Sequence, residues 1–221
     1  MISNPPGRAA SQRQHHTVTA GAADVDTLSQ VIADAFFDLP PSRWLIPDEA
    51  ARRRIFPRYF RIFVNHALAN GVVHTTPDRT AAALWLPVTQ NGPIPPVNYS
   101  TRLAAATGEW LDRFTAFDAA LDLHHPAGIA HYHLAMLAVR PDRQGQRIGS
   151  ALLHAYYHHH LDHAAGVPAY LEAASPRTRD LYLRHGYTDL GAPIHLPGGP
   201  AMYPMLREPG SRQQPSRPTR L

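Results

Sequence analysis

Residues 134–153 read LAMLAVRPDRQGQRIGSALL, and this stretch decides the fold. Its first six residues are apolar, as in a buried strand, and Pro141 and Gly145 indicate a tight turn. From Ile148 onward the apolar residues recur at helical spacing. The free N–H groups and the dipole of a first helical turn favour an anion such as a diphosphate. We therefore predict a strand–turn–helix unit that binds a phosphorylated ligand.

Length and composition indicate a single domain. The chain has 221 residues, 44% of them hydrophobic, which suffices for one well-filled core. We place the domain at 15–207 and expect the polar ends, 1–14 and 208–221, to be disordered. The sequence contains no run of about 18 apolar residues and begins without the pattern of a signal peptide. We therefore expect a soluble, cytoplasmic protein, either a monomer or a homodimer.

Two residue types are absent, and their absence excludes several chemistries. There is no cysteine and no lysine, so arginine supplies the whole Lys+Arg count of 21. Thiol nucleophiles, thiolate zinc sites, Walker phosphate loops and pyridoxal Schiff bases each need one of these side chains. The net charge of +4 suits an anionic small molecule, and no aromatic–basic motif predicts binding to nucleic acid.

Apolar spacing and turn residues divide the rest of the chain into helices and strands. Helices are predicted at 24–37, at 48–69 with a break or kink at Pro57, at 103–123, at 145–165, and from Ser175 to Gly186. Strands are predicted at 16–20, 71–75, 81–86, 131–139, 169–173, 187–196 and 201–206. The order is that of an α/β protein.

Three separate motifs resemble those of the GNAT acetyltransferases. The cofactor loop of that family reads Gln/Arg-x-x-Gly-x-Gly/Ala after a Val-x-Pro strand end, and residues 144–149 read QGQRIG. Downstream, residues 170–177 read YLEAASPR and 181–187 read LYLRHGY, in the order and at the separation of the family's ending. Two positions depart from the pattern, because Arg147 replaces the first loop glycine and Thr178 replaces a frequent asparagine.

The resemblance implies a GNAT fold, with a mixed sheet of six to seven strands flanked by helices. It also implies acetyl-CoA as co-substrate. The residues matching the cofactor-binding segment are Leu137, Ala138, Val139, Arg143, Gln144, Gly145, Gln146, Arg147, Ile148, Gly149, Ser150 and Thr178.

Direct attack by an amine on the thioester needs a base and an acid. The resemblance assigns the acid to Tyr182, which would otherwise be a core tyrosine. For the base or amine anchor we propose Glu172, because a carboxylate in an apolar strand either faces a cleft or pairs with a cation. His131 and His133 alternate on one strand and face the same side, so His133 is a second candidate base and His131 a candidate substrate contact.

Aromatic side chains in the first half of the chain are candidates for a substrate pocket. We expect most of these aromatic side chains to belong to the core, and those considered for the pocket are Phe36, Phe37, Trp44, Tyr59, Trp85 and Trp110. The likeness within the family favours a small-molecule amine such as an aminonucleoside antibiotic, with 103–123 as a possible lid. Acetylation of a peptide or protein N-terminus and an inactive acyl-CoA sensor remain as alternatives.

Histidines between 154 and 163 have the i, i+4 spacing of metal ligands, together with Asp162. The His-Glu-x-x-His pattern is absent and amine acetylation needs no metal, so we predict no metal site.

Overall fold

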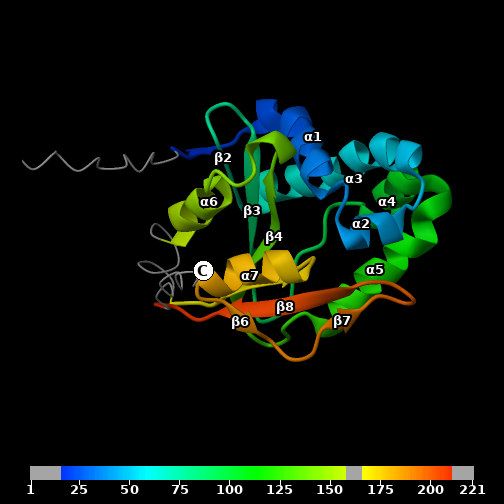
Figure 1. Cartoon of the computed structure of the whole chain (residues 1–221). Coiled ribbons are helices and arrows are strands. Elements are labelled where there is room, and N and C mark those ends of the chain that lie inside the picture. Colours follow the sequence, from blue (N-terminus) through cyan, green and yellow to red (C-terminus); the bar gives the residue numbers. More distant parts are fainter. Residues whose placement is uncertain (1–15, 158–165, 211–221) are drawn as a thin grey trace, which may run out of the picture.

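The computed structural model describes residues 16–157 and 166–210, which form a mixed sheet covered by helices on both faces (Figure 1). The strand order is β1-β2-β3-β4-β5-β8-β6, with β7 paired to β8. All neighbours are antiparallel except β4 and β5. The strands are β1 (Val18–Thr19), β2 (Val72–Thr75), β3 (Ala81–Val88), β4 (His131–Val139), β5 (Ala169–Ala173), β6 (Thr188–Asp189), β7 (Ile194–His195) and β8 (Ala201–Arg207). The chain therefore has the predicted mixed α/β architecture.

The described residues form eight strands, whereas the sequence predicted six to seven. The extra strand arises in the stretch 187–196, which we predicted as one strand. It divides into β6 and β7 around Gly191, whose φ of +76° lies in the left-handed region. This closing segment lies along β8 at the bottom of Figure 1.

The two faces of the sheet have separate cores. On one face α1 (Val25–Phe36) and α3 (Glu49–Asn70) pack on β3 and β4, burying side chains such as Leu28, Phe56 and Leu84. On the other face α6 (Ile148–Tyr156) and α7 (Pro176–Arg184) bury Leu152, Tyr182 and Leu171. In Figure 1 these two sets of helices lie on different sides of the strands.

A β-bulge in β4 determines which residues face each core. Consecutive residues Leu84 and Trp85 of β3 pair with Met136 and Leu134, so Ala135 is an extra residue in β4. Odd-numbered residues before the bulge therefore share a face with even-numbered residues after it. The histidines at the start of β4 face the side covered by α1 and α3, and the later odd-numbered residues face α6.

The strands β4 and β5 pair only where they begin. Their register pairs are Tyr132 with Ala169 and His133 with Tyr170, and no later pair forms between the two strands. On its other edge β5 pairs with β8 along its whole length. The edge of β4 beyond His133 therefore has backbone groups that β5 does not use.

Three predicted helices differ in the structure. The predicted helix 103–123 is two helices, α4 (Tyr99–Thr107) and α5 (Leu111–His124), because Gly108 with a φ of +56° ends the first. Of the break or kink predicted at Pro57, the break does not occur, since α3 continues through this residue. The helix predicted from Gly145 starts at Ile148, and its predicted end at residue 165 lies outside the described residues.

A short helix, α2 (Pro40–Leu45), was not predicted. Its two prolines occupy the first helical positions, where a missing N–H costs nothing because that group has no partner within the helix. No helix in the described ranges is long and apolar enough to cross a membrane.

Candidate active site

The turn between β4 and α6 has the conformation expected for a glycine-rich loop. Gly145 and Arg147 have φ values of +76° and +65°, so Arg147 adopts a left-handed backbone where the related motif has glycine. The side-chain amide of Gln144 donates to the carbonyl of Val139 at 3.1 Å and ties the turn to the strand. Arg147 itself is exposed.

The backbone N–H groups of residues 148–150 form no hydrogen bond within α6 and can therefore bind a ligand. The first intrahelical bond to Arg147 comes from the N–H of Ala151, at 3.0 Å. The preceding three N–H groups thus belong to the unpaired first turn. At Gly149 this turn lies close to the sheet, where a Cβ would be 3.7 Å from Val139 Cγ2 and 3.8 Å from Leu137 Cδ2. These are ordinary contact distances, so alanine also fits.

A cleft of about 890 Å³ opens in front of this turn, between the ends of α1 and β4 and the helices α6 and α7. Four arginines line it: Arg143, Arg147, Arg177 and Arg184. Ten of the predicted cofactor residues also line it, namely Leu137, Val139, Arg143, Gln144, Gly145, Arg147, Ile148, Gly149, Ser150 and Thr178. Cationic side chains and unpaired N–H groups fit the phosphates of a nucleotide-like ligand.

Two predicted cofactor residues do not line the cleft. Ala138 is buried in the core against α1 and α3, because the bulge turns even-numbered residues of this part of β4 to that face. The exposed Gln146 is absent from the lining. We therefore leave both side chains out of the proposed site.

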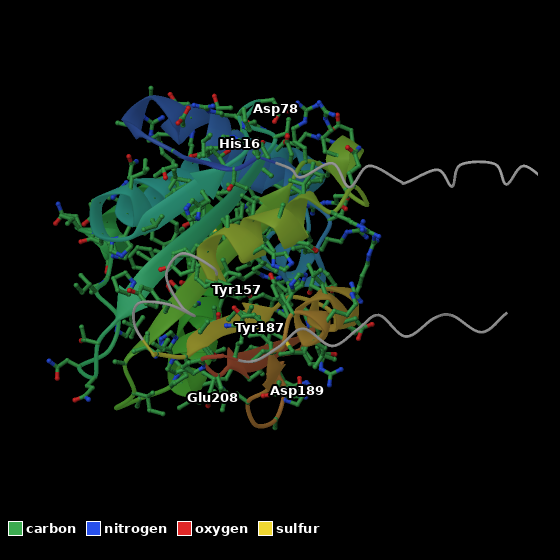
Figure 2. All side chains as sticks on the ribbon, turned by 90° about the vertical axis from the view of Figure 1, so that its left-hand side faces the viewer. His16, Asp78, Tyr157, Tyr187, Asp189 and Glu208 are labelled. Atoms are coloured by element: carbon green, nitrogen blue, oxygen red, sulfur yellow. The ribbon has the colours of Figure 1, made fainter. Side chains whose placement is uncertain are left out.

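Tyr182 lies in the wall of the cleft on α7 and is 8% exposed. Its ring packs edge-on against Tyr187 at 5.6 Å between centroids, and Figure 2 shows Tyr187 beside Tyr157. Burial raises the pKa of Tyr182 well above its usual value. The phenol therefore stays protonated at neutral pH, as a proton donor requires.

Glu172 and His133 form a close pair on the opposite face of the sheet. The Nε2 atom of His133 lies 3.0 Å from Oε2 of Glu172. The Glu172 side chain is 7% exposed and that of His133 is 19% exposed, so the histidine is the more accessible partner. Burial alone raises the pKa of Glu172, but the charges and hydrogen bonds of His133 and His125 outweigh burial and lower it.

Two further histidines extend this pair. His125, which follows α5, places Nδ1 3.9 Å from Oε1 of Glu172 and Nε2 3.1 Å from Nε2 of His131. His131 Nδ1 lies 2.8 Å from the carbonyl of Ile129. Since a carbonyl only accepts, this nitrogen carries the proton, and the other ring nitrogen of neutral His131 accepts from His125. Burial lowers the pKa of His131 and favours this neutral form.

Sequence reasoning missed His125 and Tyr170. The Tyr170 ring lies 4.9 Å from the His125 ring and 5.6 Å from each of the His131 and His133 rings. Because it alternates with Glu172 on β5, Tyr170 was detectable as facing the same side. Nothing in the pattern around His125 signals its position, which depends on how α5 packs.

The predicted aromatic residues lie in different places. Phe36 lines the cleft. Trp44 is half-buried and donates from Nε1 to the carbonyl of Pro197 at 3.1 Å, while the Arg113 guanidinium lies 5.5 Å from its ring. Trp44 thus joins α2 and α5 to the turn before β8.

Three other predicted aromatic contacts lie away from the cleft. Trp85 is completely buried and stacks on Tyr156 with centroids 4.2 Å apart, and Tyr59 packs against Phe114 in the other core. Phe37 lies under the guanidinium groups of two arginines of α3. We therefore leave Phe37, Tyr59 and Trp85 out of the proposed substrate contacts.

Most of the histidines with metal-ligand spacing, His158, His159, His160 and His163, lie outside the described residues, as does Asp162. Within the described part of the chain no group of three His, Cys, Asp or Glu side chains is arranged to hold a metal ion.

Residues 110–189 match the family model described as an acetyltransferase (GNAT) domain. This segment is similar to a GNAT acetyltransferase domain, and the fold is that of the GNAT acetyltransferases. The matched segment includes the cofactor turn, the base candidates on β4 and β5, and Tyr182. GNAT acetyltransferases are acetyl-CoA-dependent N-acetyltransferases, so acetyl-CoA is the co-substrate of this domain.

Solved structures with the same fold include three acetyltransferases. The histone acetyltransferase HPA2 and related acetyltransferase from Corynebacterium glutamicum is 23% identical with a TM-score of 0.63, covering 92% of this chain and 97% of that one. Arylalkylamine N-acetyltransferase 2 from Aedes aegypti is 11% identical with a TM-score of 0.60, covering 87% and 98%. The Drosophila melanogaster polyamine N-acetyltransferase, which forms N-acetylagmatine, is 17% identical with a TM-score of 0.54, covering 87% and 100%. These similarities establish the fold.

Proposed function

We propose that this protein acetylates the primary amine of a small molecule, with His133 as general base, Glu172 as the carboxylate that orients it and Tyr182 as general acid. The observation that carries this assignment is the 3.0 Å contact between His133 Nε2 and Glu172 Oε2. An ionised carboxylate accepts from Nε2–H, which leaves Nδ1 of neutral His133 as a free lone pair. That nitrogen is the one able to take a proton.

The reaction balances with these groups alone. The amine nitrogen attacks the thioester carbonyl carbon, a C–N bond forms and the C–S bond breaks. The amine proton passes to His133 Nδ1, and the departing thiolate takes the phenolic proton of Tyr182. The products are the N-acetyl amide and free coenzyme A, and proton exchange with water restores both side chains.

The position of these groups relative to the sheet supports the scheme. Tyr182 and Leu137 line the same cleft, whereas His133 faces the other side of the sheet. Between them runs the edge of β4 that β5 leaves unpaired. A thioester at this edge would meet the backbone N–H groups of Leu137 and Val139, because Ala138, like Arg140, directs its N–H toward β3, and such donors suit the developing oxyanion.

For the acceptor we propose a primary amine that carries an aromatic group. Phe36 lines the cleft and Trp44 lies at the junction of α2, α5 and the turn before β8. The sequence resembles puromycin N-acetyltransferase at 34–41, 166–172 and 196–200, which favours an aminonucleoside antibiotic and a role in self-resistance or biosynthetic tailoring. Arylalkylamines are the next class, as in the Aedes aegypti enzyme.

Two other functions remain to be tested. Acetylation of a peptide or protein N-terminus is favoured by the similarity to the protein from Corynebacterium glutamicum. An inactive acyl-CoA sensor is favoured by Arg147 in the glycine position. The oriented His133 and the protonated Tyr182 speak against a sensor, since binding alone needs neither.

The test is release of coenzyme A from acetyl-CoA by the purified protein across aminonucleosides, arylalkylamines, polyamines and short peptides. We expect turnover of an aromatic small amine and little turnover of peptides. Turnover of peptides alone would favour the second function, and acetyl-CoA binding without turnover of any amine would favour the sensor.

A further inference from the structure

The two helices that wall the cleft are joined by a side-chain contact that the proposed chemistry does not use. Ser150 is the third residue of α6 and lines the cleft. Its Oγ lies 3.0 Å from Nε2 of His185, the residue that follows α7. The contact therefore lies beside the free N–H groups of the first turn of α6.

The surroundings of His185 determine where its proton lies. His185 is 6% exposed, and burial lowers its pKa to about 4, so the ring is neutral at pH 7 and has one N–H. Nδ1 is buried and has no hydrogen-bond partner within residues 16–157 and 166–210. A buried N–H without a partner is rarer and more costly than an unused acceptor. The proton therefore belongs on Nε2, which donates to Ser150 Oγ.

This arrangement sets the direction of the serine hydroxyl. When Ser150 Oγ accepts from His185, its own hydrogen is free to point into the cleft. In the opposite tautomer Nε2 carries no proton and accepts the hydrogen of the serine hydroxyl. Only the lone pairs of Ser150 Oγ would then face an anion in the cleft. Only the first arrangement adds a donor to the N–H groups of residues 148–150.

We propose that His185 is a positioning residue for the diphosphate of acetyl-CoA, acting through Ser150. His185 holds the Ser150 hydroxyl as a donor toward the phosphates, so the cleft has a fixed side-chain donor beside its backbone donors. The role concerns binding of the co-substrate and does not depend on the base, the acid or the identity of the amine.

The experiment measures the Kd of acetyl-CoA and of acetyl-pantetheine, which lacks the diphosphate and the adenosine, by calorimetry. Four variants are compared with the unchanged chain: Ser150→Ala, His185→Leu, His185→Gln and the Ser150→Ala/His185→Leu double variant. We expect Ser150→Ala and His185→Leu each to raise the Kd of acetyl-CoA about 10- to 100-fold, the range for a hydrogen bond to a charged group. The double variant should be no weaker than the weaker single variant. Acetyl-pantetheine should bind all variants alike, and His185→Gln, whose amide N–H can replace Nε2–H, should recover most of the affinity.

Additive losses in the double variant, an equal loss for acetyl-pantetheine, or unchanged binding in Ser150→Ala would each overturn the proposal. Should His185→Leu fail to fold, nitrogen NMR of His185 in the unchanged chain gives an independent result. A protonated Nε2 supports the proposal, and a protonated Nδ1 contradicts it. Because binding needs no acceptor amine, a negative result here leaves the proposed reaction untouched.

Discussion

His133 and Glu172 are 39 residues apart in sequence and come from two parallel strands, yet their side chains meet at 3.0 Å on one face of the sheet. The pair forms where β4 and β5 part, since His133 belongs to their last register pair, with Tyr170, and Glu172 lies beyond that pair. The accessible histidine is thereby fixed by a buried carboxylate. This relationship makes separate predictions for the two residues.

Removing the imidazole should cost more activity than removing the negative charge behind it. We expect His133→Ala to lower kcat about 10²- to 10⁴-fold, as for loss of a general base. Glu172→Gln keeps an acceptor for Nε2–H, so it should lower kcat less, with little change in the KM of acetyl-CoA. Steady-state kinetics with a turned-over amine decides this. A larger loss in Glu172→Gln than in His133→Ala would make Glu172 the base.

The same pair should make folding stability depend on acid pH. The pKa of folded Glu172 is lowered, so the stability due to its ionised form is present above the unfolded value of about 4.3 and is lost as pH falls below it. The Tm of the Glu172→Gln variant should fall less steeply than that of the unchanged protein as the pH drops below 5. Thermal melts at several pH values for both proteins measure this difference. Parallel Tm curves would show that the pair contributes no pH-dependent stability.

Tyr182→Phe tests the acid on the other side of the sheet. We expect kcat to fall about 10²-fold or more while the KM of acetyl-CoA stays nearly constant, because the ring and its packing on Tyr187 remain. Since burial raises the pKa of the phenol, the unchanged protein should show no loss of rate from Tyr182 ionisation below about pH 10. A rate in Tyr182→Phe within twofold of the original would assign the proton to water or another group.

The sequence predicted the segments whose signals are local. The strands 131–139 and 169–173, the N-cap of α7 at Ser175 and the left-handed Gly186 after its end were all correct, since apolar alternation, an N-cap and a left-handed glycine are properties of a few adjacent residues. The cofactor turn was recognised for the same reason. Local patterns also gave Glu172 and His133 as candidates, but without their contact.

What the sequence could not provide depends on packing between distant segments. The bulge at Ala135 reverses the alternation of β4, and this reversal placed Ala138 in a core where the motif predicted a cofactor contact. His125 reaches Glu172 only because α5 ends beside β4. Tryptophan is a residue type common in ligand pockets, but Trp85 is stacked in the core on Tyr156.

Arg147 offers a test of what an arginine does in a glycine position. Its left-handed φ of +65° costs a residue with a side chain on the order of 1 kcal/mol, so Arg147→Gly should raise the Tm. Arg147→Ala keeps the strain and removes the charge, so it is the matched control. If the guanidinium pairs with the phosphates, both variants should weaken acetyl-CoA binding and make the Kd less dependent on salt. Unchanged Kd values in both variants would show that the side chain turns away from the ligand.

The contact between Gly199 and Trp44 predicts how the turn before β8 affects the amine. A Cβ on Gly199 would lie 2.4 Å from Cδ1 of Trp44, closer than any such contact allows, and the indole is rigid. Gly199→Ala should therefore displace the turn and break the bond from Trp44 Nε1 to the Pro197 carbonyl. We expect a higher KM for the amine with an unchanged KM for acetyl-CoA, whose cleft neither residue lines. The Gly199→Ala/Trp44→Ala double variant separates the two causes: it relieves the clash, so a KM that stays raised would assign the effect to the lost indole, and a recovered KM would assign it to the displaced turn.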